Sequence, residues 1–180
     1  SYLNTGGDRI TRASTEPLEL DQFYHVAATW DGTFSDLGFK LYVNTELVES
    51  YSFNPVGSID GYLESELPMS IGRSKSGGEY AAFFQGIIDE VSIWSRVLSA
   101  EEILDKMIAH EQLIPASEEG LVGYWPFDEG PVSARETFAY DVSGNGNDGI
   151  IYGAEYIEET PVTVYGCMDP TAVNYNGDAN

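Results

Sequence analysis

The chain contains the run Phe23-Tyr24-His25-Val26-Ala27-Ala28-Thr29-Trp30-Asp31-Gly32 and, shortly after it, Gly38-Phe39-Lys40-Leu41-Tyr42-Val43-Asn44. The first run is rich in aromatic and β-branched residues and ends in Asp-Gly, which is a strong turn signal. A second turn leads from the second run into residues 46–51, which again read as a strand. The three runs therefore predict a meander of three antiparallel strands.

The second run alternates as a strand does when one of its faces is buried. Phe39, Leu41 and Val43 share one face, and Lys40 and Tyr42 share the other. Successive side chains of a strand point to opposite faces, so the first group is expected to face the core.

Strand and turn patterns continue over most of the chain. Residues 68–73 read as a short strand closed by a polar loop at 74–78. Residues 83–94 are the most apolar run, and their β-branched content predicts a central strand with a bulge or a close backbone approach at Gly86. Further strands are predicted at 120–127 and 150–152.

One helix is predicted after the apolar run. Ser99 and Glu102 have the spacing of a capping box, in which each side chain accepts a hydrogen bond from the backbone amide of the other residue. Apolar residues then recur at helical spacing from Ile103, and the helix is expected to end before Pro115. Many short strands, regular turns and one short helix predict an all-β, antiparallel jelly-roll β-sandwich.

The charge balance limits the possible partners. The 180 residues include 30 acidic and 8 basic side chains, for a formal net charge of −22. Such a chain repels nucleic-acid phosphates and anionic membrane surfaces. No apolar stretch approaches the roughly 18 residues that a membrane helix needs. The acidity either attracts divalent cations or only keeps an extracellular protein soluble, and both interpretations can hold.

Five motifs follow one another along the chain: Tyr24-His25-Val26-Ala27-Ala28-Thr29-Trp30-Asp31-Gly32, Leu41-Tyr42-Val43-Asn44, Ser70-Ile71-Gly72-Arg73, Gly86-Ile87-Ile88-Asp89-Glu90-Val91-Ser92-Ile93-Trp94 and Arg96-Val97-Leu98-Ser99-Ala100-Glu101-Glu102-Ile103. In this order they resemble the laminin-G-like (concanavalin-A-like lectin/glucanase) jelly roll of bacterial surface proteins. Residues 120–130 with 141–149 resemble another segment of the same family, so that the resemblance covers roughly residues 20–157.

The resemblance predicts a laminin-G-like domain over residues 1–157 and a linker with a partial repeat over 158–180. The segment like 120–150 opens the domain in many family members but here follows the helix. Residues 120–157 are therefore either the closing strands of this domain or the start of a second copy. The strands that usually come first in the family are expected before residue 1, which leaves the sandwich incomplete as given.

The tail from Gly166 resembles a short Gly-Cys-x-Asp-Pro-x-Ala-x-Asn-Tyr-Asn repeat of secreted bacterial proteins. In those proteins a second cysteine usually follows. The resemblance implies a disulfide partner for Cys167 beyond residue 180, and hence an oxidising compartment at the cell surface or outside the cell.

The resemblance also implies a structural calcium site. Asp89 is expected to face a loop that contains Asp141, Asn145 and Asn147. Carboxylate and amide oxygens ligate a hard cation, and the glycines between them let backbone carbonyls turn inward. The alternative is that these residues only form Asx turns, which need no metal.

Catalysis finds no support in the sequence. Glucanases of this fold need two carboxylates across one cleft and usually carry Glu-x-Asp-x-x-Glu on one strand. Glu46 and Glu49 lack the middle aspartate, and Asp89 and Glu90 are adjacent, which places them on opposite faces of a strand. We therefore expect no enzyme and no catalytic residue.

Aromatic side chains serve as sugar platforms in carbohydrate-binding sites. The loop aromatics are the candidates here, but the sequence does not select among them: Tyr51, Phe53, Tyr62 and Tyr80. The tryptophans Trp30, Trp94 and Trp125 are expected in the core. His25 is expected to be a hydrogen-bonded core or edge residue of its strand.

These observations predict a non-catalytic extracellular adhesion or carbohydrate-binding module of a larger secreted protein, stabilised by calcium. Its partners would be a glycan or a surface protein and sister domains of the same polypeptide, with no nucleic acid and no membrane insertion. The alternative is a structural domain that assembles into a surface layer or fibre and has no glycan ligand.

Overall fold

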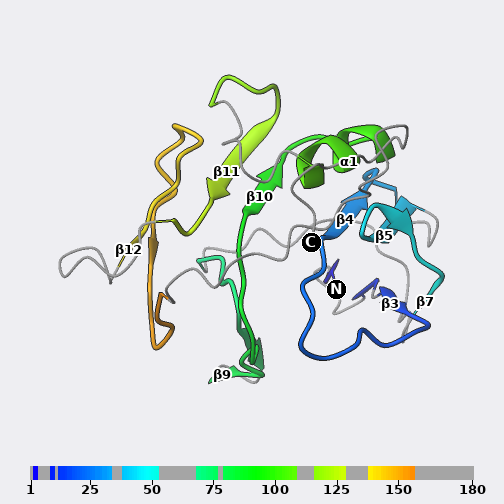
Figure 1. The fold of residues 1–180 in the computed structure, drawn as a ribbon, viewed down its shortest axis with the longest axis horizontal. Coiled ribbons are helices and arrows are strands. Elements are labelled where there is room, and N and C mark those ends of the chain that lie inside the picture. The colour runs from blue at the N-terminus through cyan, green and yellow to red at the C-terminus, as the bar shows by residue number, and fades with distance from the viewer. Residues whose placement is uncertain are drawn as a thin grey trace, which may run out of the picture. The chain divides into compact units, whose positions relative to one another are not determined.

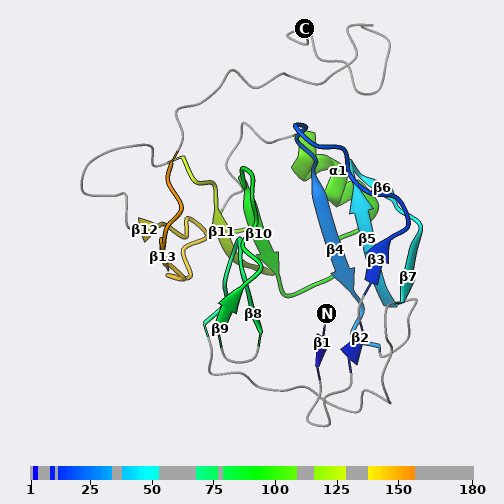
Figure 2. The same ribbon diagram turned by 90° about the horizontal axis from the view of Figure 1, so that it is seen from below.

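The three-strand meander that the sequence predicts is present in the computed structural model of the chain. Strands β4 (Val26–Trp30), β5 (Phe39–Val43) and β6 (Glu46–Leu47) form one antiparallel sheet in that order. β4 and β5 run side by side, with Val26 opposite Val43 and Trp30 opposite Phe39 (Figures 1 and 2). The structure describes residues 2–3, 9–10, 12–33, 38–52, 68–76, 79–108, 116–128 and 138–156.

The burial of β5 differs from its alternating pattern. Tyr42, expected on the outer face, is the most buried residue of the strand at 8% exposed. Tyr42 lies opposite Ala27 on β4 and Leu47 on β6, so it is flanked on both sides of the middle strand. The burial of a strand residue depends on its neighbours on adjacent strands, and here it departs from the simple alternation.

Backbone hydrogen bonds and one tight turn fix the meander. Between β5 and β6, Asn44 and Thr45 both have positive φ, 47° and 72°, as a type I′ hairpin turn requires. The Asn44 side chain accepts a hydrogen bond from the His25 backbone amide at 3.1 Å, and the Asn44 amide donates to the His25 carbonyl at 2.8 Å. After β4, the Asp31 amide donates to the Gly38 carbonyl at 3.0 Å.

The predicted strand at 46–51 is divided in two. β6 ends at Leu47, and β7 (Ser50–Ser52) pairs instead with β3 (Arg12–Ser14). A further pair near the start of the chain joins β1 (Tyr2–Leu3) to β2 (Arg9–Ile10).

The apolar run at 83–94 was predicted as one central strand, and that prediction is wrong for most of its length. Only β10 (Val91–Trp94) is a strand. Ala82 and Glu90 have positive φ, 49° and 53°, and residues in the left-handed region interrupt the extended backbone at both ends of 83–89. The predicted strand at 68–73 is also displaced, because β8 (Ser74–Ser76) and β9 (Glu79–Ala81) form a hairpin where a polar loop was expected.

β10 pairs with β11 (Leu121–Trp125), and α1 (Ala100–Ile108) lies between them in the chain. This part holds four buried apolar side chains, and two of them are almost fully buried: Tyr124 (0% exposed), Ile103 (1%), Trp125 (5%) and Leu121 (8%). A Cβ atom on Gly123 would lie 2.4 Å from the Trp125 ring, so the ring packs directly over the glycine. Trp125 is in the core as predicted, whereas Trp30 and Trp94 are half-buried.

A further strand pair joins β12 (Phe138–Ala139) to β13 (Gly149–Ile150). The Phe138 and Tyr140 rings stack at 6.3 Å between centroids, and the Tyr156 hydroxyl donates to the Phe138 carbonyl at 3.0 Å.

The chain divides into two compact units. One comprises Ser1–Pro126 with Val142–Gly146, and the other comprises Phe127–Asp141 with Asn147–Asn180. Over the described residues the fold is mostly antiparallel β-strands with one helix, as predicted for a β-sandwich. None of the helices in the described part of the chain has the length and apolar character to cross a membrane. The tail at 158–180 with Cys167 and the predicted helix limit at Pro115 lie outside the described residues.

Candidate functional site

The loop that was predicted to bind calcium is held to β11 by its own side chains. The Asn145 side-chain amide donates to the carbonyls of Leu121 at 3.0 Å and Val122 at 3.1 Å, and to the Ser143 hydroxyl at 3.1 Å. Ser143 is buried at 3% exposed. The amide nitrogen of Asn145 therefore anchors the loop, and its side-chain oxygen is the atom that is suited to a metal.

Asp141 and Asn147 are brought together by a hydrogen bond. The Asn147 backbone amide donates to Asp141 Oδ2 at 2.9 Å, and the Asp141 amide donates to Asp148 Oδ1 at 2.9 Å. Asp141 is buried at 9% exposed. The hydrogen bond from Asn147 to Asp141 spans six residues, whereas an Asx turn joins a side chain to the amide two residues on, so it is not the Asx turn that was weighed against calcium.

Asp89, the fourth predicted ligand, is exposed and lies two residues before β10. Its Oδ1 accepts a hydrogen bond from the Glu90 amide at 3.1 Å. Among the described residues, no three side chains of the types His, Cys, Asp and Glu gather closely enough to hold a metal ion. The proposed ligand set has only two carboxylates beside two asparagine amides, so this absence does not test it. The calcium site therefore stays a prediction.

Glu90 is a carboxylate that the sequence did not single out. It is half-buried with φ of 53°, and it accepts a hydrogen bond from the hydroxyl of Tyr124, which is fully buried. A buried tyrosine hydroxyl needs a hydrogen-bond partner, so a core position for Tyr124 would have predicted a nearby acceptor. The interaction ties the start of β10 to β11.

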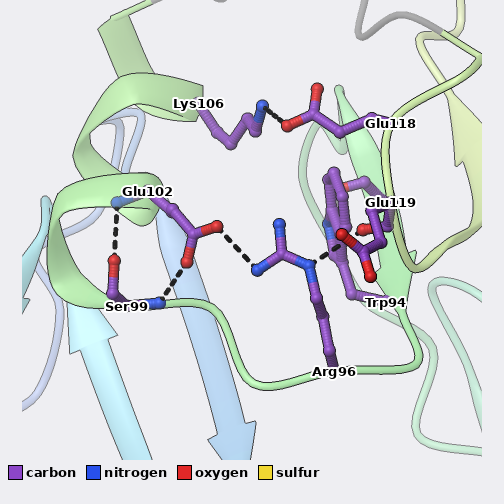
Figure 3. Close-up of polar contacts among 8 residues, drawn as sticks. Trp94, Arg96, Ser99, Glu102, Lys106, Glu118 and Glu119 are labelled. Carbon is purple, nitrogen blue, oxygen red and sulfur yellow. Dashed lines mark hydrogen bonds and ion pairs between the residues drawn. The ribbon is translucent and has the colours of Figure 1, made fainter.

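A network of charged and polar groups lies beside Trp94, and we call it the Trp94 cluster. It consists of Trp94, Arg96, Ser99, Glu102, Lys106, Glu118 and Glu119 (Figure 3). The Arg96 guanidinium and the Lys106 ammonium lie 5.5 and 5.4 Å from the Trp94 ring centroid, within the range of cation–π contacts.

Each cation of the Trp94 cluster also has a carboxylate partner. Arg96 pairs with Glu102 at 2.6 Å and donates to the Glu119 carbonyl at 2.8 Å, while Lys106 pairs with Glu118 at 2.5 Å (Figure 3). The contacts join α1, β10 and the turn before β11. Because both cations are paired with protein carboxylates, we interpret the cluster as structural: it holds these elements together.

The predicted capping box is confirmed in the same cluster. The Glu102 amide donates to Ser99 Oγ at 3.2 Å, and the Ser99 amide donates to Glu102 Oε2 at 2.7 Å (Figure 3). The hydrogen bond from the Ser99 amide, assisted by Arg96, lowers the pKa of Glu102. The helix therefore begins where the sequence places it.

Two further groups have shifted pKa values. Asp31 accepts hydrogen bonds from the Thr33 hydroxyl at 2.6 Å and the Thr33 amide at 2.8 Å, and these lower its pKa. Burial lowers the pKa of His25 below its ordinary value of 6.5. His25 was expected to be hydrogen-bonded, but its buried Nδ1 has no hydrogen-bond partner among the residues that the structure describes.

The aromatic side chains exposed in the described residues are not those predicted to contact sugar. They are Phe23, Phe83, Phe84, Phe138 and Tyr152. The side chains of Tyr51, Phe53, Tyr62 and Tyr80 lie outside the described part of the chain. The sequence missed Phe83 and Phe84 because both were assigned to a central strand.

The antiparallel strand pairs and the helix of the described residues are consistent with a concanavalin A-like β-sandwich. A laminin G-like family model, described as the concanavalin A-like lectin/glucanases superfamily, matches residues 1–104. Since this is more than half of the 180 residues, the chain belongs to that family. Laminin G-like domains are typically non-catalytic binding modules. No curated protein and no solved structure matches the chain.

The match contains all five motifs from 24–32 to 96–103 and ends within α1. The later segments at 120–130 and 141–149 lie outside it. Their likeness to the family, and with it the division of the chain at residue 157, stays a prediction.

Proposed function

We propose that the chain is a non-catalytic adhesion or carbohydrate-binding module of a larger secreted protein, acting at the cell surface or outside the cell. The observation that carries this proposal is the family match over residues 1–104, together with the antiparallel strands of the described residues. The net charge of −22 also favours a neutral or cationic ligand over nucleic acid or an anionic membrane. Sister domains of the same polypeptide would be its neighbours.

Calcium is part of the proposal as a structural ion. Asp89, Asp141, Asn145 and Asn147 are the proposed ligands. The oxygen of Asn145 and the carboxylate of Asp141 fit such a role chemically, because both side chains are held by hydrogen bonds to the backbone and offer hard oxygen donors. The ion would neutralise negative charge in the loop and hold its backbone in place.

The test is a binding screen of the purified chain against neutral polysaccharides, with calcium and then with excess chelator. We expect saturable binding to at least one neutral glycan, weakened by the chelator. Binding to none, together with binding to another protein of the cell surface, would assign the module to protein adhesion. Binding to neither class would overturn the proposal and favour an assembly domain.

A further inference from the structure

Asn145 is followed directly by Gly146, and this pair is chemically unstable in a polypeptide. The backbone nitrogen of the residue after an asparagine attacks the side-chain carbon Cγ, and glycine has no side chain to hinder the attack. Asparagine is for this reason a thermolabile residue, above all before glycine. The same dipeptide occurs once more in the chain, at Asn176-Gly177.

The surroundings of Gly146 leave its nitrogen accessible. Gly146 has a φ of 74°, and no heavy atom of the described residues, its chain neighbours aside, lies within 4 Å of the position of a Cβ atom. Asn145 is exposed, so water reaches it. Neither crowding nor burial therefore protects this pair of residues.

The side-chain nitrogen of Asn145, in contrast, is held in place. It donates to the carbonyls of Leu121 and Val122 at 3.0 and 3.1 Å and to the Ser143 hydroxyl at 3.1 Å. This nitrogen leaves as ammonia when asparagine deamidates, and it needs a proton to do so. Two of its partners are carbonyl oxygens, and the Ser143 hydroxyl donates its own hydrogen to the Val122 carbonyl at 3.4 Å. The three partners supply no proton, so deamidation requires the loop to open.

We propose that Asn145 is a modification site at which spontaneous deamidation releases the loop from β11 irreversibly. Hydroxide removes the Gly146 amide proton, the nitrogen forms a bond to Asn145 Cγ, and the Cγ–Nδ2 bond breaks. Nδ2 takes a proton from water and leaves as ammonia, which produces a succinimide ring. Water then opens the ring at either carbonyl and yields aspartate or isoaspartate. The net reaction consumes water and releases ammonia, so it needs no oxidant, reductant or enzyme.

The product cannot return to the anchored position. An aspartate side chain at this position is ionised at neutral pH and has no hydrogen to donate. Its oxygens would face the carbonyl oxygens of Leu121 and Val122, which also only accept hydrogen bonds. Each opening that ends in deamidation therefore leaves the loop detached, and detached copies accumulate as the protein ages.

Deamidation of the whole chain tests the proposal, with a chelator present so that calcium plays no part. The chain would be incubated at mildly alkaline pH with and without urea, and peptide mass spectrometry would follow Asn145 and Asn176. In urea both sites should react at similar rates, because glycine follows each. Without urea, Asn145 should react about tenfold more slowly than in urea, or slower still, since opening a hydrogen-bonded loop costs free energy. Equal rates at Asn145 in both conditions, or no product in urea, overturn the proposal.

Two serine variants test whether these hydrogen bonds control the reaction. Ser143→Ala removes one acceptor of the Asn145 nitrogen and should raise the rate without urea by about threefold or more. Ser14→Ala is the matched control, because the Ser14 hydroxyl on β3 also donates to a backbone carbonyl, that of Glu16 at 2.9 Å. Equal acceleration in both variants would attribute the reaction to general unfolding and overturn the proposal.

Hydrogen exchange measures the release itself. The Val142 amide donates to the Tyr124 carbonyl at 2.9 Å and therefore reports the contact between the loop and β11. Asn145→Asp reproduces one product and should speed the exchange of this amide by about tenfold or more. Gln85→Glu makes the same replacement of an amide by a carboxylate at an exposed residue outside the loop, and it should leave the exchange unchanged. Circular dichroism checks that each variant is folded. A Val142 amide as protected in Asn145→Asp as in the wild type overturns the proposed release.

Discussion

At the scale of single residues, His25 links burial to pH. Burial lowers its pKa below 6.5, and its buried Nδ1 has no hydrogen-bond partner in the described part of the chain. The unfolded chain therefore binds the proton more readily than the folded chain, and stability falls as the pH drops from about 6.5 through the lowered pKa. Above the ordinary value of 6.5 the contribution of the neutral imidazole is fully present.

His25→Phe should remove this part of the pH dependence of stability, because the phenylalanine side chain cannot bind a proton. The measurement is urea unfolding of the wild type and the variant across the pH range from neutral to mildly acidic. His110→Phe serves as the control, since it removes the other of the two histidines. An unchanged pH slope in His25→Phe would contradict this assignment.

At the scale of elements, the capping box and the ion pairs of the Trp94 cluster are expected to differ in importance. Ser99→Ala removes the acceptor for the Glu102 amide and should destabilise the chain by about 1 kcal/mol, as lost N-caps usually do. Glu102→Gln keeps a side-chain oxygen for the Ser99 amide and loses the ion pair with Arg96. Glu102→Gln should therefore lower the free energy of unfolding by less than Ser99→Ala does, because partly exposed ion pairs contribute little.

Urea unfolding of both variants would measure the difference, and far-ultraviolet circular dichroism would report the helix content. The lowered pKa of Glu102 adds a second readout, since its contribution is present above the unfolded pKa and is lost as the pH falls through the folded one. Glu102→Gln should therefore be less sensitive to acid. A Glu102→Gln variant that loses as much stability as Ser99→Ala would show that the ion pair is the stronger element.

The same elements show what the sequence could predict. The turn at Asn44 and the capping box of Ser99 and Glu102 were both correctly predicted. Each depends on residues only a few positions apart in the sequence. The prediction of a central strand at 83–94 was wrong because Ala82 and Glu90 are left-handed, and Glu90 has a contact distant in the sequence, the hydrogen bond from Tyr124. Hydrophobic periodicity carries no signal for such a left-handed residue.

The candidate site likewise has features that the sequence predicted and features that it did not. Asp141 and Asn147 were predicted to lie in one loop, but the hydrogen bond between them spans six residues and is not the Asx turn that was considered. The anchoring of Asn145 to the carbonyls of Leu121 and Val122 spans more than twenty positions and was not foreseen. The exposure of Phe83 and Phe84 was also missed, because an apolar run reads as core unless its partners are known.

At the scale of the whole molecule, the net charge of −22 opposes the folded state by self-repulsion. Arg96 and Lys106 are two of the eight basic residues, and both already pair with carboxylates. Any cation should therefore raise the melting temperature by screening, so that a rise with calcium is informative only against salts of equal ionic strength. This sets the design of the calcium experiment.

Thermal unfolding would be measured in calcium, in magnesium and in sodium chloride at matched ionic strength, and then after excess chelator. A calcium site in the folded state should raise the melting temperature by several degrees more in calcium than in the other two salts, because a ligand that binds only the folded chain stabilises it by mass action. Asp141→Asn keeps a side-chain acceptor for the Asn147 amide but loses the charge, so it should abolish the additional rise. Glu155→Gln removes one exposed carboxylate that is not a proposed ligand and should keep it. An equal rise in all three salts would mean that screening accounts for the whole effect, and the loop would then be held by its hydrogen bonds alone.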